Sequence, residues 1–315
     1  MPPAASHAQL EAASAARRVE KHARPIACME VWGGSAAFEA CLSVPGNHVR
    51  ISCTPHAGDA SGGDVYYISS CAAGLITRFV LADIAGHGET IAKVALALRK
   101  LMRTHINTAD QTRFAVALNE AFSAIDTGGK FATALLATYF APTDHLIVCN
   151  AGHPRPLLYR ERTGMWMLLD ASTPGAVGGA GDGHSSVGIK NLPLGIIDPT
   201  NYEQFAIRLE PSDIVVMYTD ALMEASDASG KQLGERGLLD MAALLSAEER
   251  AEVARTLHDR VLLHARTGPL DDDATLMALH HTAENPARLT LTGHAAKLMR
   301  MLGVGAIDSG PDIVS

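Results

Sequence analysis

The feature that most constrains the fold is a series of seven apolar runs of strand length, rich in β-branched or aromatic residues. They are Val65–Ser70, Arg78–Ala82, Ala134–Phe140, Leu146–Cys149, Phe205–Leu209, Ile214–Tyr218 and Thr275–Leu279. Runs of this length and composition are typical of β-strands. Short turns separate several of them, which favours antiparallel pairing. We therefore expect antiparallel sheets to dominate the fold.

Helical stretches lie between some of these runs. Apolar residues recur at helical spacing from Ile91 to His105 and again from Phe114 to Ile125, and a later pair is expected near Leu238–Leu245 and Val253–Ala265. Antiparallel sheets with separate helices indicate an α+β protein in which helices cover the sheets, rather than a βαβ repeat.

Composition excludes several classes of function. The 315 residues include 26 Lys and Arg against 34 Asp and Glu, and the formal charge is -8. Sequence-independent nucleic-acid binding needs clustered basic residues, so nucleic acid is not expected as a partner. No apolar run approaches the roughly 18 residues of a membrane helix, so no membrane insertion is expected. The five cysteines form no CxxC pair, and the start of the chain has no apolar signal region. We expect a cytoplasmic protein with reduced thiols.

The ends of the chain differ from its centre. Residues 1–24 are rich in alanine and permit a helix, which Pro25 discourages from continuing. We divide the chain into an N-terminal helical lead-in (residues 1–44), a central domain (residues 45–282) and a C-terminal appendage (residues 283–315).

Aspartates stand where the predicted strands begin or end. Asp64 opens the strand DVYYISS, and Asp83 closes the strand RFVLAD. If Ala73-Gly74 forms a two-residue turn between them, residue 71 faces residue 76 and Asp64 faces Asp83. Two carboxylates would then meet across the open end of one hairpin.

A similar arrangement is predicted later in the chain. Asp220 closes the strand DIVVMYTD, and Asp271, Asp272 and Asp273 directly precede the strand ATLMAL. If these two strands also pair antiparallel, all these carboxylates gather at one edge of the sheets. A single aspartate at a strand end is usually a turn residue or a helix cap, but four such ends point to a site.

Such a cluster is unfavourable without a cation. Like charges directly opposite each other destabilise a strand pair. At an effective dielectric constant of about 20, two charges about 4 Å apart repel by roughly 4 kcal/mol. Hard oxygen ligands select Mg²⁺ or Mn²⁺, and three or four carboxylates suit two ions better than one. Hydrolysis of a phosphoester is the chemistry that such a pair of ions serves.

A set of motifs in fixed order resembles one enzyme family. The motifs are SGGDVYYI (Ser61–Ile68), LADIAGHG (Leu81–Gly88), CNAGHPRPLLY (Cys149–Tyr159), LPLGI (Leu192–Ile196), DIVVMYTDALMEA (Asp213–Ala225) and DDDATLMAL (Asp271–Leu279). Their order and spacing over about residues 45 to 280 resemble the bacterial SpoIIE/RsbU-type branch of the PP2C metal-dependent serine/threonine phosphatases.

The resemblance implies a β-sandwich of two antiparallel sheets flanked by helices, with two Mn²⁺ or Mg²⁺ ions at one edge. By motif position, Asp83 would bridge both ions, assisted by the backbone carbonyl of Ile84. Asp64 would serve one ion directly or through water, and Asp220 and Asp272 would hold the other. Asp272 is preferred to Asp273 because it is the first acid of the Asp-Asp-x-Thr form.

The sequence departs from the family pattern in places. Ile84 and Ala85 stand where animal-type members have a glycine and a histidine that is proposed to protonate the leaving group. The phosphate-binding arginine that precedes the first aspartate in those members is missing here. Phosphate contact would then come mostly from metals and water, which predicts a modest intrinsic rate.

Four further residues are assigned supporting roles. His87, next to Gly86 before the helix that starts near Ile91, is displaced from the proton-donor position and is expected to cap or brace the turn. Asn150 and His153, in the NAGHP segment, are expected to form a turn at the edge of the site that orients other residues.

The resulting hypothesis is a protein phosphatase that removes phosphate from serine or threonine of a partner protein with a metal-activated water. By resemblance, the partner is a STAS-type anti-sigma-factor antagonist. The alternatives are a pseudophosphatase that binds a phosphoprotein without turnover and a metal phosphohydrolase for small molecules or nucleotides. We also expect regulation through the helices over residues 91–125, with the N-terminal helix as a homodimer or sensor contact.

Overall fold

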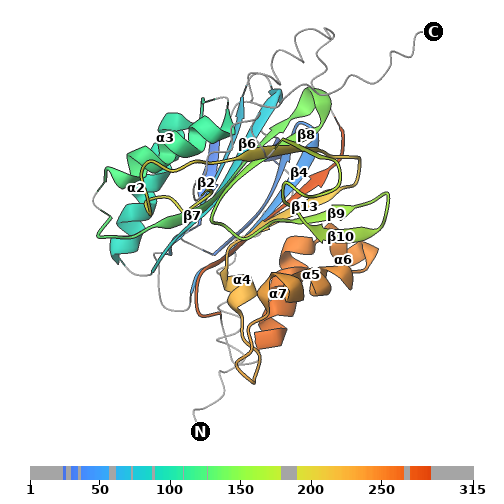
Figure 1. Ribbon diagram of the computed structural model, residues 1–315. Helices are drawn as coiled ribbons and strands as arrows, with labels where there is room; N and C mark the ends of the chain where they lie inside the picture. Colours follow the sequence, from blue (N-terminus) through green and yellow to red (C-terminus); the bar gives the residue numbers. More distant parts are fainter. Residues whose placement is uncertain are drawn as a thin grey trace, which may run out of the picture.

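The computed structural model describes residues 24–25, 30–34, 37–56, 62–71, 74–86, 89–108, 110–125, 127–178, 190–265 and 270–284. Within these residues, two seven-stranded sheets pack face to face and helices cover both outer faces (Figure 1). The predicted α+β sandwich of two antiparallel sheets flanked by helices is confirmed.

Sheet 1 joins strands from the two ends and the middle of the chain. Its order is β1 (Arg24–Pro25), β3 (Phe38–Val44), β4 (Asn47–Thr54), β14 (Ala274–His281), β13 (Ile214–Tyr218), β9 (Leu157–Arg160) and β10 (Met165–Leu168). The pairs are antiparallel except β1 with β3.

Sheet 2 is antiparallel throughout. Its order is β11 (Ala176–Gly178), β12 (Gln204–Arg208), β8 (His145–Ala151), β7 (Ala132–Phe140), β6 (Ile76–Ile84), β5 (Asp64–Cys71) and β2 (Glu30–Gly33). A short 3₁₀ turn, η2 (Ala141–Thr143), joins β7 to β8.

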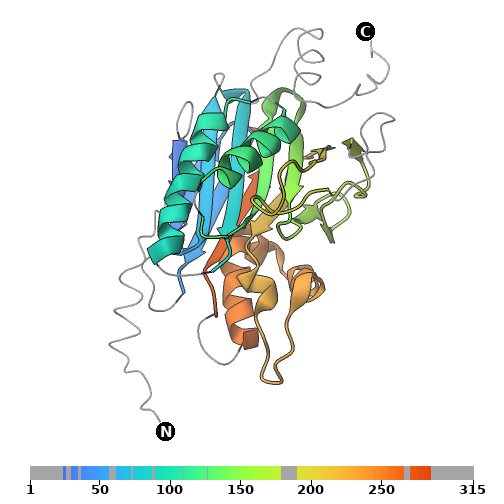
Figure 2. The same ribbon diagram turned by 60° about the vertical axis from the view of Figure 1, so that its left-hand side comes forward.

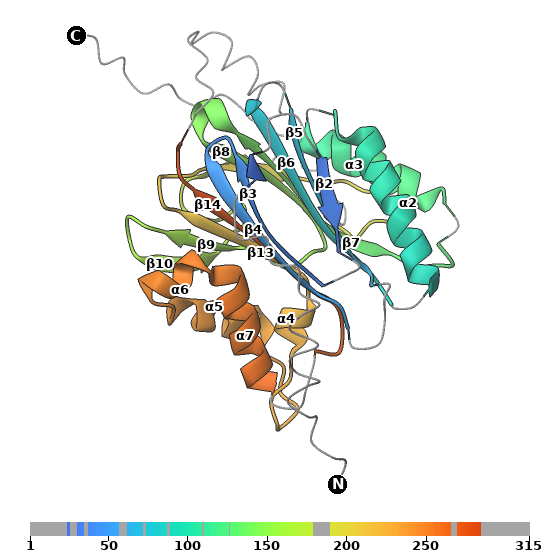
Figure 3. The same cartoon turned by 180° about the vertical axis from the view of Figure 1, so that it is seen from behind.

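The helices form two separate layers, seen from three sides in Figures 1, 2 and 3. Helices α2 (Glu89–His105) and α3 (Gln111–Ser123) lie on sheet 2. On the other side, α5 (Gly234–Ala243), α6 (Ala247–Ala251) and α7 (Val253–Ala265) cover sheet 1, with the short α4 (Ala221–Glu224) at its end. In the described residues, no helix has both the length and the apolar character needed to cross a membrane.

Three apolar layers hold this architecture together. One lies between the sheets and includes Ile68, Leu81 and Met217. A second joins sheet 2 to α2 and α3, and a third joins sheet 1 to α4, α5 and α7. The central strand β7 is therefore buried on both faces along nearly its whole length. This double burial explains why ATALLATYF is a continuous apolar run and not an alternating one.

The predicted helical lead-in over residues 1–44 is wrong where the structure describes it. Strand β2 is an edge of sheet 2, and β3 pairs with β4 in sheet 1, so both belong to the central domain. The turn at Pro45-Gly46 links β3 to β4, and Gly46 has a φ of 80°. The other predicted helical residues, 1–23, lie outside the described residues, as do residues 285–315 of the predicted appendage.

Candidate metal centre

The hairpin of β5 and β6 has the predicted register. Asp64 pairs directly with Asp83, and Cys71 pairs with Ile76 at the other end. Paired residues in an antiparallel sheet point to the same face. Asp64 and Asp83 have the same parity as Ile68 and Leu81, whose side chains pack between the sheets. The two carboxylates therefore face the space between the sheets at one end of the sandwich.

Sheet 1 brings its acidic residues to the same end. Strand β13 pairs antiparallel with β14, and the Thr219 N–H donates to the Thr275 carbonyl at 3.1 Å. Asp220 follows β13, and the run Asp271–Asp273 precedes β14. The predicted antiparallel pairing of these two strands is thus confirmed, and residues from both sheets meet at one edge.

The electrostatics show that these carboxylates interact. Burial, followed by the charges of Asp220 and Asp272, raises the pKa of Asp83 to about 8. Burial, followed by Glu224 and Asp272, raises the pKa of Asp220 to about 6. Burial and the charge of Asp83 also raise the pKa of Asp64. A desolvated group of like charges is strained when ionised, and nearby cations would relieve that strain.

Asp64 joins the two sheets. Its side chain is 1% exposed, and its Oδ2 accepts a hydrogen bond of 3.0 Å from the Thr219 hydroxyl of sheet 1. Its Oδ1 is buried and forms no hydrogen bond of ordinary geometry with the described residues, while the Thr275 side chain lies close enough to this carboxylate to oppose part of the rise in its pKa. A buried carboxylate oxygen without a donor is the kind of atom that a cation would bind.

Asp273 differs from Asp272 in its contacts. Its Oδ1 accepts from the His56 N–H and its Oδ2 from the Gly63 N–H, both at 2.8 Å. The Asp273 N–H in turn donates to the Asp272 Oδ1 at 2.8 Å. Since both Asp273 oxygens already hold backbone donors, that side chain fixes the chain before β5. These contacts support the preference for Asp272 over Asp273 as a ligand.

Two glycines allow the backbone to approach the carboxylates. A Cβ on Gly62 would be 2.1 Å from the Asp273 Oδ2. A Cβ on Gly63 would be 2.7 Å from the Ile84 carbonyl oxygen and 3.3 Å from the Asp83 Oδ1. The Ile84 carbonyl oxygen and the Asp83 carboxylate therefore both lie close to the Gly63 backbone.

The donor set fits hard divalent cations, but it is not tightly assembled. Among the residues described, no three His, Cys, Asp or Glu side chains are grouped closely enough to hold one ion. The carboxylates would close by side-chain movement around the ions. The orphaned Asp64 oxygen, the raised pKa values and the glycine approach all favour Mg²⁺ or Mn²⁺ at this edge.

The supporting residues lie as follows. Asn150 brackets His153, because its Oδ1 accepts from the His153 N–H at 2.7 Å and its Nδ2 donates to the His153 carbonyl at 2.8 Å. The predicted turn is therefore present. Gly86 has a φ of 109°, and a Cβ there would be 2.9 Å from the Lys130 Nζ. His87 lies outside the described residues.

Three residues at this edge were not predicted from the sequence. Thr219 bonds to Asp64, Thr133 pairs with Asp83, and Glu224 of α4 raises the pKa of Asp220. Thr219 directly precedes the predicted ligand Asp220, and this position next to a ligand is a sequence signal for a site residue. Thr133 gives no such signal, because only the pairing of β6 with β7 brings it to Asp83.

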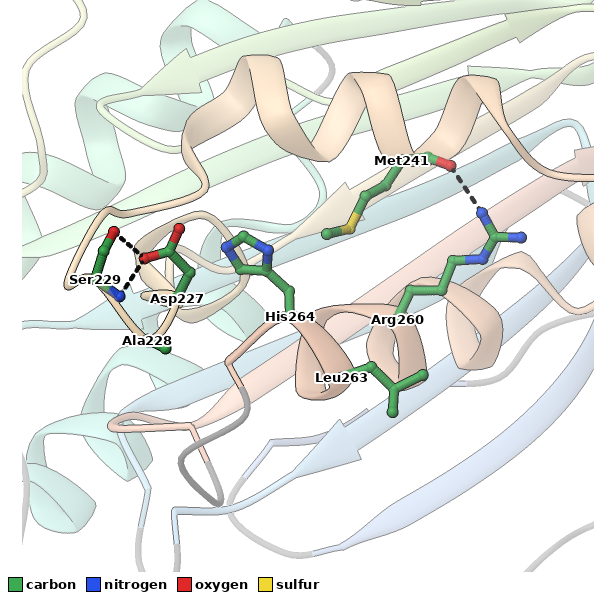
Figure 4. Close-up of a pocket in the computed structure, with 7 residues that line it drawn as sticks. All are labelled: Asp227, Ala228, Ser229, Met241, Arg260, Leu263 and His264. Carbon is green, nitrogen blue, oxygen red and sulfur yellow. Dashed lines mark hydrogen bonds between the residues drawn. The ribbon is translucent and has the colours of Figure 1, made fainter.

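A separate pocket of about 610 Å³ lies between α5, α7 and the turn at Asp227–Ser229 (Figure 4). Its lining includes Met241, Arg260 and His264, and none of the predicted ligands is among its described lining residues. The pocket is therefore distinct from the acidic edge.

Comparison with known proteins agrees with this geometry. The family model of stage II sporulation protein E (SpoIIE) matches residues 76–282. Phosphoserine phosphatase RsbU of Bacillus subtilis (strain 168) is 24% identical over 208 residues, which are 64% of this chain and 55% of that protein. The chain thus spans little more than half the length of this relative.

Solved structures show the same fold. The RsbU and RsbW domains of Rv1364c from Mycobacterium tuberculosis are 26% identical, with a TM-score of 0.58 over 83% of this chain and 70% of that chain. The phosphatase domain of SpoIIE from Bacillus subtilis is 17% identical, with a TM-score of 0.54 over 79% of this chain and 99% of that chain. RsbX in complex with magnesium is 15% identical, with a TM-score of 0.53 over 77% and 98%. Since the family model covers most of the sandwich, the chain belongs to the SpoIIE family of PP2C-type phosphatase domains.

Proposed function

We propose that this protein is a metal-dependent phosphatase that hydrolyses phosphoserine or phosphothreonine on a partner protein. The observation that carries the proposal is the Asp64–Asp83 pair of sheet 2, which meets Asp220 and Asp272 of sheet 1. The unfavourable ionisation of these groups supports a role that uses cations. The RsbU relative is itself named a phosphoserine phosphatase.

Four carboxylates and one carbonyl would hold the ions. Asp83 interacts electrostatically with Asp64 and with both Asp220 and Asp272, so it would be the carboxylate shared between two Mn²⁺ or Mg²⁺ ions. The Ile84 carbonyl would assist, since its oxygen and the Asp83 carboxylate both lie close to Gly63. Two bound divalent cations supply an activated water nucleophile and stabilise the charge on a phosphoryl group in transfer.

Other residues hold the backbone and the ligand side chains at this edge in position. Asp273 fixes the backbone at His56 and Gly63, so that Asp64 enters β5 in the correct register. Thr219 orients the Asp64 carboxylate across the two sheets. Through these contacts the chain orients the ligands before any substrate arrives, which reduces the reorganisation needed for reaction.

The partner class follows from the family resemblance. A STAS-type anti-sigma-factor antagonist in the cytoplasm is the proposed substrate. The net charge of -8 argues against nucleic acid as a partner.

A manganese-dependent assay with a chromogenic phosphomonoester tests the activity. We expect Asp83→Asn and Asp220→Asn to lower turnover at least about 100-fold, since each removes a ligand charge from the centre. Asp271→Asn is the matched control, because Asp271 is an exposed member of the same acidic run. It should retain activity within about twofold. Equal activity of all three variants would contradict the proposal.

The substrate class is tested with a phosphorylated STAS protein against small phosphomonoesters and nucleotides. A phosphoprotein phosphatase should show a kcat/KM for the phosphoprotein at least about 100-fold above that for the small molecules. Higher values for nucleotides would favour the small-molecule alternative. Tight binding of the phosphoprotein without turnover would favour a pseudophosphatase.

A further inference from the structure

A histidine lies between the two halves of the acidic edge. Thr133 of β7 is paired directly with Asp83 of β6, so the two side chains share one face and their Cβ atoms are neighbours. The Thr133 Oγ1 lies 2.9 Å from the Nδ1 of His153. One side of the imidazole is thus attached to sheet 2 beside Asp83.

The other side of the ring faces sheet 1. Burial lowers the pKa of His153. The backbone of Tyr218, the last residue of β13, lies close enough to the ring to counteract part of that shift. The Nε2 atom is buried and forms no hydrogen bond of ordinary geometry with the described residues. Tyr218 precedes Asp220 by two residues, so the ring spans from the Asp83–Thr133 pair to the end of the strand that precedes Asp220.

The position of His153 is fixed by its own loop. Asn150 bonds to both the N–H and the carbonyl of His153. Gly152 has a φ of 70°, and a Cβ on it would be 2.5 Å from the Pro193 Cγ, so the turn requires glycine. The side chain is 5% exposed. A buried polar ring with a rigid backbone is suited to hold its neighbours at a set separation.

We propose that His153 is a positioning residue that sets the separation between Asp83 of sheet 2 and Asp220 of sheet 1, through the Thr133 hydroxyl and the Tyr218 backbone. The inference rests on the proposed function, because a defined separation matters only if both carboxylates bind metal. A tyrosyl carbonyl can only accept a hydrogen bond. The Nε2–H tautomer, with Nδ1 accepting from the Thr133 hydroxyl, is therefore the one consistent with both neighbours.

Direct measurement of Mn²⁺ binding by calorimetry tests this role without reliance on turnover. Thr133→Val removes only the hydroxyl, and His153→Gln removes the group that faces Thr133. We expect each to weaken Mn²⁺ binding about tenfold, the lower end of what is seen when a partner of a metal ligand is lost. Thr77→Val is the control, since Thr77 is a buried threonine of the same sheet that lies at the opposite end of β6 from Asp83.

The double variant distinguishes positioning from separate effects. If His153 and Thr133 act as one unit, Thr133→Val combined with His153→Gln should bind Mn²⁺ about as weakly as the weaker single variant. Independent effects would multiply to about 100-fold and would overturn the proposal. His153→Asn, whose amide can still reach Thr133, should recover part of the lost affinity.

Thermal unfolding without metal provides the structural control. A residue that only stabilises the fold would lower the unfolding temperature and leave the Mn²⁺ affinity within about twofold of the wild type, and that result would overturn the inference. If His153→Gln fails to fold, Thr133→Val carries the test by itself. Absence of Mn²⁺ binding in the wild type would instead refute the proposed function.

Discussion

Asp83 is a residue whose burial and acidic neighbours disfavour the ionisation of its own carboxyl group. It pairs with Asp64, faces Asp220 and Asp272, and is removed from water, so its pKa rises to about 8. An aspartate in an unfolded chain titrates near 3.9. Between these values the folded protein without metal binds more protons than the unfolded chain. The contribution of Asp83 to stability therefore falls as the pH rises from about 4 to about 8.

This linkage gives a prediction for the metal-free protein. Relative to Asp83→Asn, its unfolding temperature should fall between pH 5.5 and pH 8, and at pH 8 Asp83→Asn should unfold at least about 2–4 °C higher, equivalent to about 1 kcal/mol. Addition of Mn²⁺ should restore the wild type at pH 8, since only the folded protein holds the carboxylates together. Thermal scans with and without chelator measure both effects. A metal-free wild type that gains stability toward pH 8 relative to Asp83→Asn would contradict this account.

Gly63 gives a second prediction at this scale. A methyl group there would lie 2.7 Å from the Ile84 carbonyl oxygen, so Gly63→Ala must displace the backbone beside Asp83. We expect Mn²⁺ affinity to fall at least about tenfold, the scale found when the surroundings of metal ligands change. Gly164→Ala is the control, with a φ of 65° and open space around it. It should cost about 1 kcal/mol of stability and leave metal binding unchanged.

At the scale of elements, Arg155 links the loop after β8 to two other segments. Its backbone N–H and its guanidinium donate to Glu235 at the start of α5 at 2.7 to 3.1 Å, and Nη1 donates to Asp170 at 2.9 Å. The same loop carries His153, and Asn150, which bonds to it, lies near the end of β8. The contact therefore holds the orienting turn against the helical layer of sheet 1.

Loss of this contact should be measurable by urea unfolding. Glu235→Ala removes three charge-assisted hydrogen bonds and should lower the free energy of unfolding by about 1–2 kcal/mol after solvent screening. Asp240→Ala removes only the exposed ion pair with Arg236 and should cost less than about 0.5 kcal/mol. Equal losses in the two variants would show that the Arg155 contact is no stronger than a surface pair.

The strands also show which parts of the fold can be predicted from the sequence. The seven predicted strands are all present, because strands buried on both faces read as continuous apolar runs. Strands β3 and β4 were missed, although Pro45-Gly46 stands between two alternating segments, because residues such as His48 and Arg50 point outward and dilute the apolar signal. Hairpin register brought Asp64 to Asp83 correctly. The Thr133–His153 contact needs the packing of two sheets, which local pattern does not encode.

At the scale of the whole molecule, both sheets need the residues before the family match. Strands β3, β4 and β5 lie between residues 38 and 71, and β5 supplies Asp64. Without them, β6 and β14 would become unpaired edges with exposed apolar faces.

Fragments test this dependence. A fragment of residues 76–282 should show no cooperative thermal transition by circular dichroism, whereas residues 30–284 should unfold in a single step and bind Mn²⁺. Cooperative folding of the shorter fragment would show that the sandwich tolerates the loss of five strands.

The pairing of β4 with β14 has a consequence for biosynthesis. On the ribosome, β4 is synthesised early, but its pairing with β14 cannot form until that final strand of the domain has been synthesised. Contacts between such distant parts of a chain close slowly and leave intermediates prone to self-association. A nascent chain of this type would thus lack a complete acidic edge until nearly the whole domain had emerged, since that edge is among the last parts to be completed.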